Sequence, residues 1–179
     1  MPHEHSIQLP HGTVKYWQYH TDKSPTLVLI HGFRGTHHGL AKIAEQLPEY
    51  HLIVPDLPGF GSSDPFPDAA HSLDRYVAFV DEFIRALKLD KPIIVGHSFG
   101  SIIASHFVSQ HPDSAEKLIL INPIGAPALE GPRGVMTRAS ARDRWKTPSV
   151  LTAKTLRHVA SSVSAIRSVA RMPATLTPK

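Results

Sequence analysis

Cysteine is absent from this chain of 179 residues. Disulfide bonds, thiolate catalysis and a zinc site built on thiolates are therefore excluded. No stretch approaches the roughly 18 consecutive apolar residues that a membrane-spanning helix requires. The opening residues Met1–His5 lack a basic region followed by an apolar stretch, so we expect no signal peptide. These absences predict a cytoplasmic protein with no membrane span.

Acidic residues are scarce in the last third of the chain. Residues 1–126 carry 9 Lys and Arg against 13 Asp and Glu, whereas residues 127–179 carry 10 against 2. Such asymmetry is typical of a tail that binds nucleic acid or an anionic membrane, or of a segment outside the main folding unit. No aromatic platform or nucleic-acid motif accompanies these charges, so we expect no nucleic-acid partner. We predict a core over 1–126 and a basic tail over 127–179.

The composition is that of an ordinary globular protein, with 41% apolar and 19% charged residues and a length suited to one core. Apolar runs and helical spacing alternate along the core. Strands are expected over residues 6–9, 14–19, 26–30, 51–54, 92–95 and 118–121, and helices over 40–47, 73–89 and 102–108. This alternation predicts an α/β fold with a doubly wound, mostly parallel sheet, preceded by an antiparallel hairpin.

The basic tail contains one further helical pattern. Its apolar residues are spaced three or four apart, at Leu156, Val159, Val163, Ile166 and Ala170. This spacing predicts an amphipathic helix that follows a Pro/Gly/Ala-rich loop over 123–133.

Three glycine-containing loops each follow a predicted parallel strand. They are His31–Gly35, Asp56–Ser63 and Gly96–Gly100. Open α/β sheets place their sites at the carboxyl ends of the strands, where these loops fall. The third loop reads Gly-His-Ser-Phe-Gly and lies between a strand and a helix. A G-x-S-x-G sequence in that setting predicts a nucleophile elbow, which lifts the Ser98 hydroxyl above the sheet edge.

In order and spacing, the three loops resemble those of the α/β-hydrolase family, serine-nucleophile branch, over about residues 6–126. The resemblance implies an eight-stranded, mostly parallel sheet with the nucleophile after the fifth strand. It also implies that Ser98 attacks the carbonyl of a small ester, after a histidine has taken its proton. The backbone N–H groups of Phe33 and Phe99 would form the oxyanion hole, and no cofactor is implied.

Other roles are open for several of these residues. Ser98 would also suit an ordinary helix N-cap. His31 is a candidate base, although a structural role bracing its loop is the favoured interpretation. His97 is expected to pack beside the nucleophile, because adjacent side chains point apart.

Two further groups of polar residues were weighed for chemistry. Asp56, Gly59, Gly61 and Ser63 are interpreted as a turn that shapes the pocket floor. The His37-His38 pair suggests a metal, but we expect adjacent histidines to face apart and find no carboxylate at ligand spacing, so no metal is predicted.

Partners for Ser98 are missing from the expected places. The family order is serine, acid, histidine. Downstream of Ser98 lie the acids Asp113, Glu116, Glu130 and Asp143 and the histidines His106, His111 and His158, none of them in a suitable loop after a strand. The sequence therefore predicts that the last two strands are absent, as in a truncated, deleted or frame-shifted hydrolase.

Two functions follow from this comparison of motifs. The first is a serine hydrolase that acts on a small-molecule ester through a Ser98 acyl-enzyme. The alternative is a catalytically inactive remnant without the acid and histidine of the triad. In either case the apolar strand 118–121 would leave an edge open to self-association unless the tail covers it.

Overall fold

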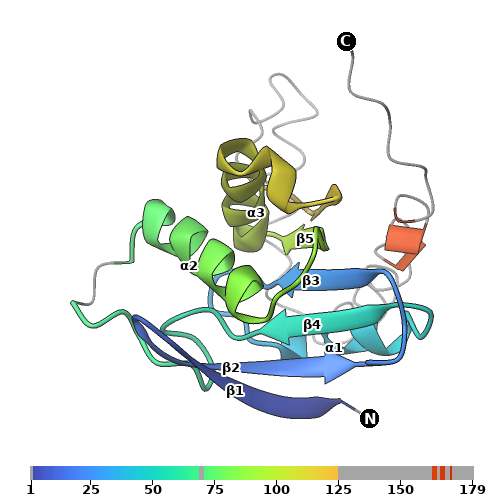
Figure 1. Cartoon of the computed structure of the whole chain (residues 1–179), viewed down its shortest axis with the longest axis horizontal. Helices are drawn as coiled ribbons and strands as arrows, with labels where there is room; N and C mark the ends of the chain where they lie inside the picture. The colour runs from blue at the N-terminus through green and yellow to red at the C-terminus, as the bar shows by residue number, and fades with distance from the viewer. Residues whose placement is uncertain (1, 69–70, 125–162, 165, 168–169, 171–179) are drawn as a thin grey trace, which may run out of the picture.

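The computed structural model describes residues 2–68, 71–124, 163–164, 166–167 and 170. Six strands form one sheet in the order β1-β2-β4-β3-β5-β6. Their bounds are β1 His3–Leu9, β2 Gly12–Tyr19, β3 Thr26–Ile30, β4 His51–Pro55, β5 Ile93–His97 and β6 Lys117–Ile121 (Figure 1). Each predicted strand is present, and β1 begins three residues earlier than expected.

The sheet is mixed, as the sequence predicts. β1 and β2 form an antiparallel hairpin whose last pair joins Leu9 to Gly12, and β2 is also antiparallel to β4. The neighbours β4, β3, β5 and β6 are all parallel. The carboxyl ends of β3, β4 and β5 therefore meet at one edge, and the three glycine-containing loops leave the sheet there.

Three helices connect the parallel strands: α1 His38–Glu45, α2 Leu73–Ala86 and α3 Phe99–Gln110. The Ser72 hydroxyl caps α2 by accepting a hydrogen bond from the Arg75 amide at 3.4 Å, and the helix begins at Leu73, as predicted. It ends three residues before the predicted Leu89, because Lys88 has a φ of +53° and leaves the helical region.

Alternation along the buried strands divides the core between the two faces of the sheet. Leu27 and Leu29 belong to the cluster that includes the apolar side of α1. Val28 and Ile30 belong to the cluster that includes α2 and α3. The ribbon shows the same arrangement, with α2 and α3 on one side of the sheet and α1 on the other (Figure 1). Helices on both faces make the sheet doubly wound, as expected.

Part of the basic tail packs on the α1 face. Val163, Ile166 and Ala170 are buried in the same cluster as α1. Arg167 Nε lies 2.6 Å from Glu49 Oε1, and its guanidinium also donates to the Gln46 carbonyl. These described residues are helical, at the spacing that the sequence predicts. Leu156, Val159 and the other tail residues of that prediction lie outside the described residues.

β6 is the last strand of the sheet in the described part of the chain. It pairs with β5 alone there, and its residue Leu120 is 39% exposed. Self-association through this edge stays a prediction. The described residues contain no helix long and apolar enough to cross a membrane.

Candidate active site

Ser98 is the single residue between β5 and α3. Its φ of 53° and ψ of −116° lie outside the regions that a serine ordinarily occupies. The Ser98 amide donates to the Ile121 carbonyl at 3.0 Å, which ties this turn to the end of β6. The Ser98 side chain makes no capping hydrogen bond to α3, so the simple N-cap interpretation is not supported. The strand–turn–helix geometry that the elbow prediction requires is therefore present, and the nucleophilic role of Ser98 stays a prediction.

Close packing around the elbow requires small residues. A Cβ added at Gly100 would collide with the carbonyl oxygen of Ile30, so α3 approaches β3 only because this residue is glycine. The loop after β3 is equally near: a Cβ at Gly32 would lie 3.1 Å from Ser98 Cβ. The first and third glycine-containing loops therefore meet at Ser98.

Phe33 and Phe99, the proposed oxyanion donors, lie on these two loops. Phe99 is the first residue of α3, where N–H groups have no acceptor within the helix and the helix dipole favours negative charge. Phe33 lies in a turn closed by the Gly35 amide and the Gly32 carbonyl at 3.0 Å. The two phenyl rings meet edge to face with centroids 6.0 Å apart. A role for their amides stays a prediction.

His31 is buried and uses both ring nitrogens within the fold. Its Nε2 accepts from the Leu57 amide at 3.0 Å, so its Nδ1 carries the proton and donates to the Gly32 carbonyl at 2.8 Å. Burial lowers the pKa of His31 and keeps the ring neutral. The structural interpretation of His31 is supported, because neither nitrogen remains to accept a proton from Ser98.

Asp56 organises the loop after β4. It is fully buried and accepts hydrogen bonds from the His37 amide at 2.7 Å and the Ser62 amide at 3.0 Å. The Ser63 hydroxyl donates to the Asp56 carbonyl at 2.7 Å. These contacts confirm that the segment is a turn, and Gly59 within it lines the pocket described below.

The expectation that the His37 and His38 side chains face apart is wrong. The rings lie together, with centroids 3.9 Å apart, and His37 also stacks on Trp17. Asp56 supplies a carboxylate 3.1 Å from His37 Nδ1, brought from another loop by the fold. Even so, the described residues contain no group of three or more side chains placed to hold a metal ion.

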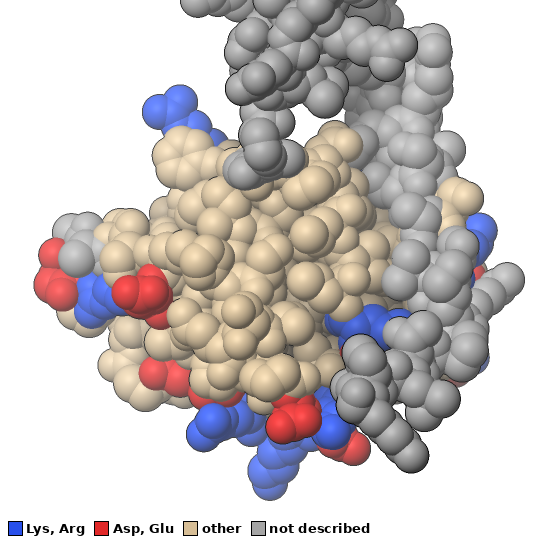
Figure 2. Space-filling view, turned by 90° about the horizontal axis from the view of Figure 1, so that it is seen from above, with Lys and Arg blue, Asp and Glu red and all other residues tan. Residues whose placement is uncertain are grey.

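An aromatic pocket with a volume of 430 Å³ opens beside the elbow. Its lining residues are Phe33, Gly59, Phe60, His71, Tyr76 and Phe99. Phe33 is 66% exposed at its mouth. Seen from above, the molecule carries its charged side chains along the margins and few at the centre (Figure 2). The geometry suits an apolar ligand whose reacting group reaches the loop that carries Ser98.

His71 and Tyr76 were not singled out from the sequence. His71 Nδ1 lies 2.7 Å from the Tyr76 hydroxyl, which in turn donates to the Pro58 carbonyl at 3.1 Å. Burial raises the pKa of Tyr76 to about 12. The available signal was their position: His71 precedes the Ser72 cap, and Tyr76 follows one turn into α2.

The downstream histidines lie away from the elbow. His106 is exposed on α3, and His111 stacks on Phe107 with its Nδ1 3.9 Å from Asp81 on α2. No described histidine is hydrogen-bonded to Ser98 Oγ. Glu130, Asp143 and His158 lie outside the described residues.

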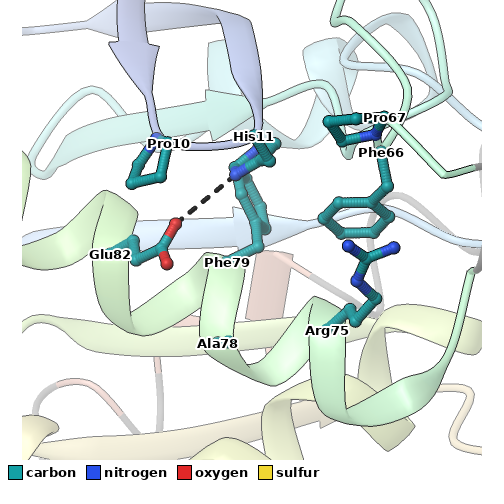
Figure 3. A pocket seen from close by; sticks show the side chains of 8 residues that line it. All are labelled: Pro10, His11, Phe66, Pro67, Arg75, Ala78, Phe79 and Glu82. Carbon is teal, nitrogen blue, oxygen red and sulfur yellow. Dashed lines mark ion pairs between the residues drawn. The ribbon is translucent and has the colours of Figure 1, made fainter.

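A second pocket, with a volume of 270 Å³, lies between the β1–β2 turn and α2 (Figure 3). His11 Nδ1 is 3.4 Å from Glu82 Oε2 on one side, and the Arg75 guanidinium is 4.8 Å from the Phe66 ring centroid on the other. None of its lining residues belongs to the elbow or to the loop after β3. We therefore assign the candidate site to the aromatic pocket.

The fold and the three loops agree with the comparison to protein families. The family described as "alpha/beta hydrolase fold" matches residues 25–163, and the chain belongs to this family. The turn that carries Ser98 follows β5, the fifth strand along the chain, which is where the resemblance placed it.

Among individual proteins, the chain is similar to one named as a lipase and to one named as an acyltransferase. It is 36% identical to Lipase 1 of Psychrobacter immobilis over 100 residues, which cover 55% of this chain and 32% of that protein. It is 37% identical to the 1-acylglycerol-3-phosphate O-acyltransferase ABHD5 of Mus musculus over 114 residues, which cover 60% and 31%. The chain thus spans about a third of the length of these curated relatives.

Solved structures show the same likeness. The crystal structure of a membrane phospholipase A, described as a bacterial virulence factor, aligns with a TM-score of 0.68 and 31% identity. The alignment covers 73% of this chain and 42% of that one.

Proposed function

We propose that this protein hydrolyses carboxylic esters with an apolar acyl chain, through an acyl-enzyme formed on Ser98. One observation carries the proposal: Ser98 occupies a strained turn between β5 and α3, with φ 53° and ψ −116°, next to an aromatic pocket. Strain of this kind is retained where it holds a group in a working position.

The reaction has two steps. Ser98 Oγ attacks the ester carbonyl carbon and gives up its proton to a base, and the alcohol leaves with that proton, so the acyl group remains on Oγ. Water then attacks the acyl carbon, the bond to Oγ breaks and the acid leaves, while the second proton of the water restores the Ser98 hydroxyl. The amides of Phe33 and Phe99 would stabilise the oxyanion in both steps, and each such donor is worth about 3 kcal/mol where one has been removed from a hydrolase.

The acyl chain is assigned to the aromatic pocket. The Phe33, Phe60 and Phe99 rings offer apolar surface, and two relatives bear the names lipase and phospholipase. Burial of each methylene contributes about 0.8 kcal/mol, so longer acyl chains should bind more tightly until the pocket is full.

A second candidate function is ester binding with little or no turnover, and one observation favours it. Among the described residues no imidazole is hydrogen-bonded to Ser98 Oγ. A chain without the base would bind the ester and turn it over slowly, keeping only what binding and the oxyanion hole provide.

Labelling with a fluorophosphonate, combined with turnover of p-nitrophenyl butyrate, tests the proposal. We expect covalent labelling and turnover in the unmodified chain and in Ser105→Ala, and neither in Ser98→Ala. Ser105 is a matched control because it lies on α3 and its hydroxyl donates only to the Ser101 carbonyl, at 2.7 Å, among the described residues. Absence of labelling in folded protein would contradict the hydrolase proposal, and ester binding without labelling would favour the inactive alternative.

A further inference from the structure

The Tyr76 hydroxyl has one proton and two neighbours. A carbonyl oxygen accepts only, so the hydrogen bond to Pro58 at 3.1 Å uses the phenol proton. The high pKa of Tyr76, about 12, keeps that proton in place at neutral pH. The Tyr76 oxygen therefore accepts its second hydrogen bond, and the donor is His71 Nδ1 at 2.7 Å.

This chain of hydrogen bonds sets the tautomer of His71. With the proton on Nδ1, a neutral imidazole has a bare Nε2 that accepts a hydrogen bond. A partner on one ring nitrogen commonly determines what the other nitrogen can do.

The absence of a side chain at Gly59 allows the His71 imidazole to pack against the pocket. A Cβ at this glycine would lie 2.5 Å from His71 Cε1 and 3.1 Å from Nε2, and Gly59 has a φ of +80°. The short distances and the positive φ both require glycine at this position. Because Gly59 lines the pocket, the Nε2 edge of the imidazole lies against the pocket wall.

Among the described residues that line this pocket, His71 Nε2 is the one side-chain acceptor without a hydrogen-bond partner. The lining residues Phe33, Gly59, Phe60 and Phe99 have no side-chain hydrogen-bonding group, and the Tyr76 hydroxyl already has two partners. An apolar cavity with one fixed polar atom selects ligands that place a complementary group at that atom.

We propose that the aromatic pocket binds apolar molecules that carry a hydroxyl group, and that this hydroxyl donates a hydrogen bond to His71 Nε2. As a statement about substrates it rests on the proposed function, and it specifies esters with a free hydroxyl, such as partial glycerides, over simple alkyl esters. As a statement about binding it needs no reaction at Ser98.

A pair of non-hydrolysable probes tests the binding directly. 1-O-octylglycerol has two hydroxyls and methyl octyl ether has none, while both carry the same octyl chain. We would titrate each probe into the Ser98→Ala protein and follow binding by NMR. The glycerol ether is kept below its micelle-forming concentration and methyl octyl ether below its solubility limit in water. We expect the glycerol ether to bind at least tenfold more tightly.

Variants of the two hydrogen-bonded residues assign the effect. His71→Phe keeps a planar ring without an acceptor and should bind both probes equally. Tyr76→Phe removes the acceptor for Nδ1, so long-range ¹H–¹⁵N spectra should change from one His71 tautomer to a mixture, with a smaller preference for the glycerol ether. His71 is exposed, so the His71→Phe protein should fold, and circular dichroism checks this.

Equal binding of the two probes to Ser98→Ala, or a preference that persists in folded His71→Phe, would overturn the inference. Spectra showing the proton on Nε2 in the unmodified protein would also overturn it. The hydrolase proposal fails in a different experiment, if fluorophosphonate does not label Ser98. That result would not change the expected preference for the glycerol ether over methyl octyl ether.

Discussion

His31 Nε2 accepts a hydrogen bond from the Leu57 amide at 3.0 Å and thereby joins the loop after β3 to the loop after β4. The other ring nitrogen donates to the Gly32 carbonyl, next to Phe33. One neutral imidazole thus holds the backbone of both loops in place. Because His31 is 1% exposed, water cannot replace these hydrogen bonds without a rearrangement of the loops.

Replacement of His31 should destabilise the protein strongly. His31→Ala leaves the Leu57 amide and the Gly32 carbonyl without their partner, which costs about 1–3 kcal/mol per group, and also opens a cavity. We expect the free energy of unfolding in urea to fall by about 3 kcal/mol. His106→Ala, at an exposed position on α3, is the control and should change it by less than about 0.5 kcal/mol. A loss no larger than that of the control would contradict the bracing role.

Stability should fall as the pH drops below about 6.5, the ordinary pKa of histidine. Burial lowers the folded-state pKa of His31 and of His37. Below pH 6.5 the unfolded chain therefore binds protons that the folded chain does not, and each such histidine removes up to about 1.4 kcal/mol per pH unit until its folded pKa is reached. Above pH 7 both states are neutral at these residues and the contribution is constant. Urea unfolding from pH 8 to 5 measures the slope, which should be shallower in His31→Gln.

Asp56→Asn tests whether the turn after β4 needs a carboxylate. Asp56 accepts at both oxygens, Oδ1 from the His37 amide and Oδ2 from the Ser62 amide. An asparagine places an NH₂ group against one of these amides, so a buried donor meets a donor. We expect a loss of about 2–4 kcal/mol in unfolding free energy. The exposed Asp22→Asn is the control, and an equal effect of the two would count against this account.

Two glycines in helices should respond to alanine in opposite directions. At Gly100 in α3 an added methyl group collides with the Ile30 carbonyl, so Gly100→Ala should cost about 3 kcal/mol or prevent folding. At Gly39 in α1 a Cβ would meet nothing within 4 Å, and Gly39→Ala should stabilise by about 0.5–1 kcal/mol through the better helix propensity. Thermal unfolding compares the pair. A tolerated Gly100→Ala would contradict the close approach of α3 to β3.

The described part of the tail should contribute to stability. Ile166 is fully buried against the α1 face, so Ile166→Ala should lower the free energy of unfolding by about 2–4 kcal/mol. Ser164 lies two residues away and is exposed, and Ser164→Ala should have little effect. Equal unfolding free energies for the two variants would show that this segment does not pack on the core in solution.

Most of the fold was predictable from local patterns. The apolar runs of the buried strands and the helical spacing of α2 are properties of short segments, which is why those elements were predicted with small errors at their ends. The G-x-S-x-G loop was recognisable for the same reason, because a sharp turn between a strand and a helix demands small residues at fixed spacing.

The errors and omissions concern residues far apart in sequence. His37 and Asp56 are 19 residues apart, so no spacing rule pairs them, and the carboxylate beside His37 was missed. The hydrogen bond between Tyr76 and Pro58 spans 18 residues and depends on the position of α2 relative to the loop after β4.

The amino-acid sequence by itself determined the order of strands and helices, the turn at Ser98 and membership of the α/β-hydrolase family. These follow from local backbone preferences and from the burial of apolar faces. Only the tertiary structure decided which protons lie where: His31 has no free nitrogen, and His71 presents a bare Nε2. A histidine's tautomer depends on the partners that the folded chain brings within 3 Å, and these partners come from different loops.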